Sequence, residues 1–306
     1  QEIARVAQLN ALQRLGVPLS TLLTPETLAK EAAAGRKKGV PEGLAWFPFA
    51  SLPPVRWAGG EALVPAEVLS WWMRQAVKVG VPEPGPLLRQ YALLLHPEDR
   101  PALALFLLQA WLARDLQPKY TAEEAAAEAQ RRYSAGSQWY TVDMIAQELR
   151  NEKTGATGEK GLLALAAACG DGRLVPPIQR YLTDWYGMRA SQCKTLVRVL
   201  AASGHPLALQ YLLAVATRFR TRGIQQEAEA CVQGLAEQHA WTVDELADRT
   251  IPTAGFDDGP ELALEYGPRQ FTARCTGTEI AIYDGGTLLK GLPEARKDDD
   301  PAKAAE

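Results

Sequence analysis

The sequence has little of the chemistry from which catalytic and metal sites are commonly built. Its 306 residues include three histidines and four cysteines, and no two cysteines have Cys-x-x-Cys spacing. A zinc site usually shows close ligand pairs, and a cysteine nucleophile usually has a local signature. Neither is present, and phosphate-loop and nucleophile-elbow motifs are also missing. We therefore expect no catalytic residue, metal site or cofactor in this chain.

Long apolar runs and an excess of one charge are absent as well. No stretch approaches the roughly 18 uninterrupted apolar residues of a membrane-spanning helix, and no secretory leader is recognisable. The net charge is −3, from 33 basic and 36 acidic residues, so the average surface carries no membrane or nucleic-acid signature. The cysteines stand in apolar or alternating runs, typical of reduced thiols: Cys169, Cys193, Cys231 and Cys275. We expect a cytoplasmic protein with no membrane partner.

The first half of the chain is predicted to be helical around one irregular segment. Apolar residues recur at helical spacing, and prolines or capping pairs mark several helix starts. The segment WFPFASLPPVRWAGG, starting at Trp46, has too many prolines for a helix. We expect its aromatic residues to pack in the core rather than to form a proline-rich ligand. The predicted helices span Glu2–Leu15, Thr24–Ala34, Pro65–Lys78, Pro86–Leu95, Pro101–Arg114, Thr121–Arg132 and Thr141–Arg150.

An internal repeat with an offset of 34 residues follows. LLALAAACGD at Leu162–Asp171 aligns with LVRVLAASGH at Leu196–His205. Each block is followed by another amphipathic helix, Leu174–Trp185 or Pro206–Phe219, and a weaker third unit spans Ile224–His239. Helix pairs that recur at this period bury their apolar faces by stacking on one another. The predicted fold class is mostly α: a HEAT- or armadillo-like α-solenoid of antiparallel helix pairs, followed by a small C-terminal antiparallel β-meander.

The period changes after Trp241. Thr242 and Glu245 have capping-box spacing and open one more short helix. Asp257-Asp258-Gly259 is expected to form a turn. Segments of alternating polarity then predict strands over Glu261–Tyr266, Gln270–Cys275, Glu279–Tyr283 and Thr287–Lys290.

Four regions follow from these patterns. Residues 1–60 are assigned to N-terminal helices and the proline-rich loop, 61–240 to helical repeats, 241–293 to a short helix plus the meander, and 294–306 to a polar tail. Because the chain begins at Gln1 rather than methionine and ends in a polar run, we expect it to be a piece of a longer protein. Within the tail, Asp298–Asp300 is interpreted as a solvated charge run rather than a metal site.

Several motifs resemble the bacterial MolR-like family, large proteins with a domain of unknown function and often a WGR module. The motifs are ELADRTIPTAGFDDG at Glu245–Gly259, YGPRQF at Tyr266–Phe271, LLKGLPEARKDDD at Leu288–Asp300 and SGHPLALQYL at Ser203–Leu212. No WGR motif is present, and the chain stops about where the family's unknown domain would begin. The resemblance implies a helical-repeat region preceding that domain. From gene neighbourhood it implies a MoxR-type ATPase or a von Willebrand A-domain protein as a partner, and it implies no mechanism.

Two groups of residues are candidates for specific roles. A basic cluster would contact phosphates and stack a base on its phenylalanine, although basic residues at a helix C-terminus also simply favour the helix dipole. Its members are Arg218, Phe219, Arg220 and Arg222, with Arg189, Lys194 and Arg198 one repeat earlier. The second group is expected to be a structural joint between helices and meander, its arginines pairing with carboxylates or helix-end carbonyls. It comprises Asp248, Arg249, Tyr266 and Arg269.

These observations favour a non-catalytic scaffold that mediates protein–protein interaction within a larger bacterial protein. Two alternatives stay open. One is a nucleic-acid-binding or transcription-regulatory module that uses Arg218–Arg222. The other is an accessory region of an enzyme whose active site lies in a C-terminal domain outside this chain.

Overall fold

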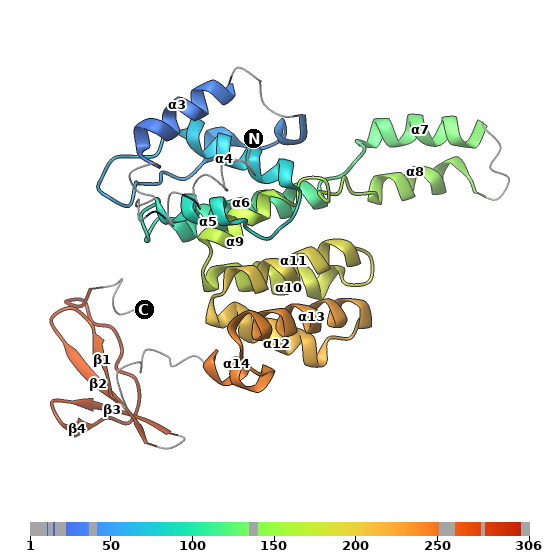
Figure 1. Ribbon diagram of the computed structural model, residues 1–306. Coiled ribbons are helices and arrows are strands. Elements are labelled where there is room, and N and C mark those ends of the chain that lie inside the picture. Colours follow the sequence, from blue (N-terminus) through green and yellow to red (C-terminus); the bar gives the residue numbers. More distant parts are fainter. Residues whose placement is uncertain are drawn as a thin grey trace. The chain divides into compact units, whose positions relative to one another are not determined.

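The computed structural model describes residues 11, 15, 23–36, 42–134, 140–250, 261–276 and 279–300. Almost all of the helix predicted over Glu2–Leu15, and the turn predicted at Asp257-Asp258-Gly259, lie outside these residues. The described chain is mostly helical, with a small four-stranded antiparallel sheet near its C-terminal end (Figure 1). It separates into two compact units, Gln1–Thr250 and Ile251–Glu306.

In its described residues, the first unit is built from α-helices joined by short links and three single turns of 3₁₀-helix. The helices predicted from periodicity in the described residues are confirmed, with ends that differ by a few residues. They are α3 (Pro25–Arg36), α4 (Ala66–Val79), α5 (Pro86–Leu93), α6 (Arg100–Leu116), α7 (Ala122–Ser134), α8 (Val142–Asn151), α9 (Leu162–Cys169), α10 (Val175–Trp185), α11 (Ala190–Ser203), α12 (Pro206–Arg218), α13 (Arg222–His239) and α14 (Val243–Arg249). The 3₁₀ turns are η1 (Glu42–Leu44), η2 (Phe49–Ser51) and η3 (Gly172–Leu174).

Local sequence explains where many of these helices begin and end. Proline occupies the first position of α5 and α12, where its missing N–H costs nothing. The predicted capping boxes are both present: Thr121 with Glu124, and Thr242 with Glu245. Gly204 closes α11 with a φ of 66°, a left-handed conformation that glycine adopts without strain.

The proline- and aromatic-rich segment packs into the core, as predicted. Phe47 and Trp57 are buried, at 4% and 8% exposure. The Phe47 ring meets Phe106 of α6 edge-on at 5.8 Å, and Trp57 meets Trp72 of α4 edge-on at 6.3 Å. Aromatic pairs in this arrangement add to the free energy gained from burial alone. The segment is therefore a structural part of the first unit.

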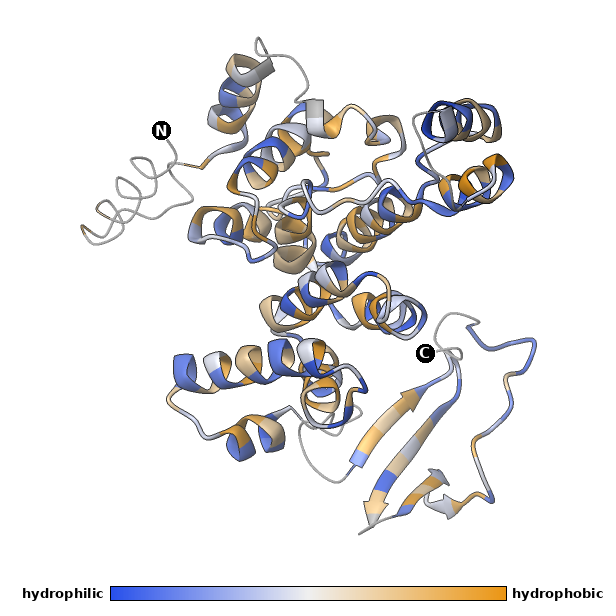
Figure 2. Ribbon diagram, turned by 90° about the vertical axis from the view of Figure 1, so that its right-hand side faces the viewer, coloured by the Kyte–Doolittle hydropathy of each residue, from blue (hydrophilic) through white to orange (hydrophobic). Residues whose placement is uncertain are grey.

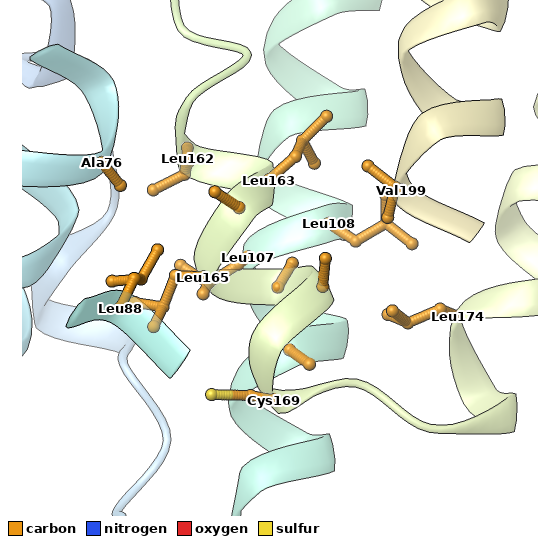
Figure 3. Packing of buried hydrophobic residues seen from close by; sticks show 14 of the residues in the cluster. Ala76, Leu88, Leu107, Leu108, Leu162, Leu163, Leu165, Cys169, Leu174 and Val199 are labelled. Carbon is orange, nitrogen blue, oxygen red and sulfur yellow. The ribbon is translucent and has the colours of Figure 1, made fainter. Parts of the chain in front are cut away.

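One continuous hydrophobic core extends from α3 to α14, with α9 at its centre. Leu162, Leu163 and Leu165 of α9 are fully buried. Figure 3 shows them surrounded by side chains of α5, α6 and α11, among them Leu88 and Val199. Each fully buried leucine stabilises the fold by about 2 kcal/mol relative to an exposed one. Figure 2 shows hydrophobic and hydrophilic residues on opposite sides of several helices, the pattern expected around such a core.

The α7–α8 hairpin is inserted between α6 and α9 (Figure 1). It has a small hydrophobic core of its own. The segments that enter and leave it run side by side. The N–H of Lys119 donates to the carbonyl of Glu152 at 2.9 Å, and the N–H of Thr154 donates to the carbonyl of Gln117 at 2.8 Å. The hairpin is thus a self-contained insertion between two helices that pack on each other. Its core consists of Ala125, Ala129, Ile145, Ala146 and Leu149.

The second unit contains the antiparallel sheet, with strand order β1-β2-β3-β4. Leu262 pairs with Ala273 and Leu264 with Phe271, so these apolar residues share one face. The predicted fourth strand is shorter than expected: Thr287 pairs with Asp284 and Leu288 with Tyr283. The strands are β1 (Glu261–Glu265), β2 (Gln270–Thr276), β3 (Glu279–Asp284) and β4 (Thr287–Leu288).

Candidate functional site

A long stretch of the first unit contains no acidic residue. No aspartate or glutamate occurs between Asp184, near the end of α10, and Glu227 in α13. The stretch nevertheless holds every basic residue of the predicted cluster: Arg189, Lys194, Arg198, Arg218, Arg220 and Arg222. Whether this positive charge is open to a ligand depends on which of these side chains are neutralised by carboxylates from other parts of the chain.

Arg189 is neutralised by Asp115, at the end of α6. Its Nε donates to Asp115 Oδ2 at 2.6 Å and its Nη2 to Oδ1 at 2.8 Å. The Arg189 side chain is 13% exposed, and that of Asp115 is not exposed at all. Arg189 therefore lies in the interior and does not share a surface with the other arginines.

Further donors complete the surroundings of Asp115. The hydroxyl of Tyr181 and the amide of Gln192 donate to its side chain at 2.5 and 3.2 Å, and the N–H of Ala156 donates at 2.8 Å. Burial opposes ionisation of Asp115, but hydrogen bonds from Arg189, Tyr181 and Ala156 keep its pKa below the ordinary value. Burial, followed by the hydrogen bond to Asp115, raises the pKa of Tyr181. We call Asp115, Tyr181, Arg189 and Gln192 the Asp115 cluster, and its role is structural.

Lys194 and Arg198, both on α11, are also paired. Lys194 lies 3.9 Å from Glu227 of α13, and Arg198 forms an ion pair with Glu83 in the α4–α5 link. These pairs are partly exposed, so each stabilises the fold by about 1 kcal/mol or less. Their consequence for the site is larger, because they cancel the positive charge that the sequence places on α11.

Arg218, Arg220 and Arg222 remain. They are exposed, and they alternate with the half-buried Phe219 and Thr221. The backbone is extended at both intervening residues, with φ and ψ of −73° and 136° at Phe219 and of −101° and 109° at Thr221. None of these arginines forms an ion pair with any residue that the structure describes. We call residues 218–222 the arginine link.

Tyr186, in the link between α10 and α11, lies against the arginine link. The Arg220 guanidinium lies 4.7 Å from the centre of the Tyr186 ring and donates to its hydroxyl at 3.1 Å. Phe219 meets Tyr186 edge-on at 6.3 Å, and both rings pack against the hydrophobic core. Phe219 is thus a packing residue, which weakens the expectation that it stacks a base. Met188, two residues beyond Tyr186, is 75% exposed. We call Tyr186, Met188, Arg218, Arg220 and Arg222 the basic edge.

The residues predicted to form a joint are divided between the two units. In the first unit, the Arg249 guanidinium lies 4.6 Å above the ring of Trp241, which in turn stacks on His239 at 4.5 Å. Asp248 is exposed at the end of α14. Arg249 thus contacts an aromatic ring in the described chain, rather than a carboxylate.

Tyr266 and Arg269 tie the C-terminal segment to the sheet of the second unit. Arg269 donates to both carboxylate oxygens of Asp299, at 2.9 Å from Nε, and to the carbonyl of Glu294. Tyr266 donates its hydroxyl to the carbonyl of Pro293 at 3.0 Å. The interpretation of Asp298–Asp300 as a solvated run is wrong for Asp299, whose side chain is 1% exposed. The hydrogen bond from Arg269 lowers the pKa of Asp299 to about 2.

Several observations on the described residues bear on metal binding, pockets and cysteine chemistry. They contain no group of three or more His, Cys, Asp or Glu that could hold a metal ion. A mostly apolar pocket among α4, α5 and α9 has a volume of about 90 Å³, below the roughly 300 Å³ at which small-molecule sites begin. Burial raises the pKa of both Cys169 and Cys193 to about 12, so these side chains are thiols rather than nucleophilic thiolates at neutral pH. None of the described helices has the length and hydrophobicity needed to cross a membrane.

Comparison with known proteins gives one informative similarity. No protein-family model matches the chain, and no solved structure matches it. A stretch of 112 residues, 36% of the chain, is 35% identical to the uncharacterized protein YehI of Escherichia coli (strain K12). The chain spans 9% of the length of that relative. The similarity therefore links the chain to part of a much longer protein whose name specifies no activity.

Proposed function

We propose that this chain is a non-catalytic helical-repeat scaffold that binds another protein at its basic edge. The observation that carries the proposal is the arginine link, where three exposed arginines keep their charge beside Tyr186 while the other basic residues of the acid-free stretch are paired. A charged surface without convergent catalytic groups suits recognition better than chemistry.

The repeat itself supports a HEAT-like arrangement of the helices. Tyr186 and Arg220 are 34 residues apart, the offset of the sequence repeat, and they are in contact. At the other end of the helix pairs, the turn that follows α9 closely approaches the turn that follows α11. Gly172 lies so near to His205 that a Cβ atom placed on the glycine would be 3.1 Å from the histidine ring. Residues about one repeat apart thus meet at both ends, as in a stack of similar units.

Helix contacts agree with this arrangement. α9 packs on α11 and α11 packs on α13, while α10 packs on α12. These contacts support two rows of helices, one with α6, α10 and α12 and the other with α9, α11 and α13. The α7–α8 hairpin then occupies the link within the first pair, where the later pairs have links of a few residues. Solenoids commonly present such edges and faces to partner proteins.

The partner proposed first is a protein of the bacterial cytoplasm. The resemblance to the MolR-like family makes a MoxR-type ATPase or a von Willebrand A-domain protein the first candidates to test. Reduced, buried thiols at Cys169 and Cys193 suit a cytoplasmic location.

Site-directed photo-crosslinking tests the scaffold function. A photoreactive phenylalanine analogue placed at Met188 on the basic edge should crosslink a defined partner protein in cells. Leu207, 44% exposed at the start of α12, is the matched control because it lies at the opposite end of the helix pairs. A protein partner trapped from Met188 but not from Leu207 supports the proposal. Equal crosslinking from both positions, or none from Met188, contradicts it.

A nucleic-acid-binding module is the second candidate, favoured by the absence of acidic residues between Asp184 and Glu227. If it is correct, binding of duplex or single-stranded DNA should weaken steeply between about 50 and 200 mM salt. Arg220→Glu should weaken it further. Binding that is absent or insensitive to salt in a polarisation titration removes this candidate.

A further inference from the structure

We infer that the basic edge recognises an acidic segment of its protein partner, one that carries several carboxylates. This inference rests on the scaffold function proposed above and adds the chemistry of the partner. It commits to a peptide ligand rather than to nucleic acid.

The open charge of the arginines carries the first step. Arg218, Arg220 and Arg222 are exposed within five consecutive residues, where the chain bends from α12 into α13, and none is ion-paired with a described residue. Arginine binds carboxylates through two parallel hydrogen bonds. A peptide segment with several acidic residues therefore offers these guanidinium groups the counter-charges that the described chain does not supply.

Favourable interactions with helix dipoles do not explain the position of every arginine in the arginine link. Arg218 stands in the last turn of α12, where a cation is favoured by the dipole. Arg222 is the first residue of α13, where the dipole disfavours a cation. The positive end of the α13 dipole and Arg222 therefore reinforce each other. Both add to the attraction for an anionic ligand, and folding alone does not require the combination.

The size of the charged surface favours a peptide over a nucleic acid. A protein that binds DNA with a steep salt dependence makes about 6–10 phosphate contacts, whereas the arginine link supplies three arginines and the acid-free stretch around it ends at Asp184 and Glu227. Base stacking also lacks a platform here, because Arg220 covers the Tyr186 ring and Phe219 is turned edge-on to it. A short acidic peptide needs neither a large number of basic contacts nor an open aromatic ring.

Tyr186 positions Arg220 before the ligand arrives. Stacking over the ring and the hydrogen bond to the hydroxyl hold the guanidinium in place, and only Nη1 takes part in that bond. The other guanidinium nitrogens remain for a carboxylate. A side chain that is already ordered loses less entropy on binding. Met188, two residues beyond Tyr186 and 75% exposed, offers an apolar contact for a residue that flanks the acidic run.

Anisotropy titrations of the full chain test the inference with fluorescein-labelled probes. The main probe is a peptide containing Leu-Asp-Ser-Asp-Ser-Asp, and its controls are the same peptide with Asn for Asp and a twelve-nucleotide oligothymidylate. We expect the Asp peptide to bind at least tenfold more tightly than the Asn peptide. Arg220→Glu should weaken binding tenfold or more, and Tyr186→Leu several-fold without any change in charge. Arg89→Glu is the matched control, since Arg89 is exposed on α5 and not ion-paired with any described residue. It should leave binding unchanged.

Each other outcome overturns the inference. Equal affinity for the Asp and Asn peptides excludes a carboxylate-specific site. Equal weakening by Arg220→Glu and Arg89→Glu excludes recognition at the basic edge. Tighter binding of oligothymidylate, lost in Arg220→Glu, assigns the edge to nucleic acid. The crosslinking experiment is read separately: a protein trapped from Met188 whose yield is insensitive to Arg220→Glu keeps the scaffold function and rejects the acidic segment. Circular dichroism of each variant verifies that the fold is retained.

Discussion

Asp115 is a buried carboxylate whose cost of desolvation is offset by the donors around it. Arg189, Tyr181, Gln192 and the N–H of Ala156 all bond its side chain. The donors come from the hairpin return, α10 and the start of α11, so the Asp115 cluster joins segments that are distant in sequence. Removing one member of such a group is costly because the remaining charge stays buried.

The change Asp115→Ala should lower the free energy of unfolding by about 3–5 kcal/mol, since Arg189 is left inside without its counter-charge. Urea unfolding monitored by circular dichroism measures the effect. Asp171→Ala is the control, because Asp171 pairs with Arg173 at the surface, with side chains 32% and 52% exposed. Because its side chain also caps η3 by accepting from the N–H of Arg173, the change should cost about 1–2 kcal/mol. Equal losses in the two variants would show that the Asp115 cluster is not buried in solution.

A second prediction concerns the pH dependence of the stability that the ion pair between Asp99 and Arg56 contributes. Hydrogen bonds from the side chain and backbone of Arg56 lower the Asp99 pKa from 3.8 to about 2. Because the folded pKa is depressed, the stability that this pair contributes is present above the ordinary pKa. It is lost as the pH falls from about 4 toward 2.

Arg56→Gln should therefore raise the Asp99 pKa toward 3.8, measured by NMR titration of the carboxyl carbon. Asp299, whose partner Arg269 is untouched, is the internal control and should still titrate at about 2. An Asp99 pKa that stays low in the variant would mean that other groups lower it.

Residues of the site differed in how far sequence could predict them. The positive charge of the arginine link could be predicted because its three arginines are close together in the sequence. The Asp115 partner of Arg189 could not be predicted, because the two are 74 residues apart and nothing beside either one marks the pair. Tyr186 could have been found from the repeat, since it lies one period before Arg220. The burial of Asp299 was missed because a run of aspartates is usually solvated.

At the level of elements, the start and end of a helix were predictable because caps are local. Thr242 and Glu245 bond each other across three residues, and sequence alone gives that spacing. The α7–α8 hairpin was predicted as two helices, but its status as an insertion was not. That status depends on α6 packing against α9, a contact between segments on either side of the hairpin.

Removal of the hairpin should leave the rest of the first unit folded. The N–H of Thr154 donates to the carbonyl of Gln117 at 2.8 Å. If only two residues joined Gln117 to Thr154, the same hydrogen bond would close a four-residue turn. Replacing residues 118–153 by Asn-Gly should therefore keep this bond and lose only the small hairpin core. We expect a lower helical signal in circular dichroism with an unchanged Tm. The control puts the same dipeptide in place of residues 186–189, which removes Arg189 and should lower the Tm sharply. Loss of cooperative unfolding in the first variant would contradict the prediction.

For the whole molecule, the mostly α character and the small C-terminal sheet followed from hydrophobic period alone. The boundary between the two units could not be predicted from the same hydrophobic periodicity. α14 belongs to the first unit although it follows the change of period, because Leu246 joins the continuous core. Core membership depends on three-dimensional packing, which periodicity predicts for a face of a helix but not for its neighbour.

The extent of that core predicts the behaviour of a truncated protein. The chain ending at Thr250 retains every helix of the core and should unfold cooperatively. Its Tm should change by less than about 4 °C, equivalent to about 1 kcal/mol for a domain of this size. Differential scanning calorimetry of the truncated and full chains measures this. A broad transition without cooperativity in the truncated chain would show that the first unit does not fold by itself.

The long separation within the Asp115 cluster has a consequence for biosynthesis. A ribosome adding about 5–20 residues per second needs roughly 4–15 s to pass from Asp115 to Arg189, 74 residues later. Until Arg189 has been synthesised, Asp115 lacks its counter-charge, and burial of the carboxylate alone is costly. We therefore expect the end of α6 to stay hydrated in the nascent chain until the start of α11 follows, whereas the hairpin has a small core of its own and does not depend on that step.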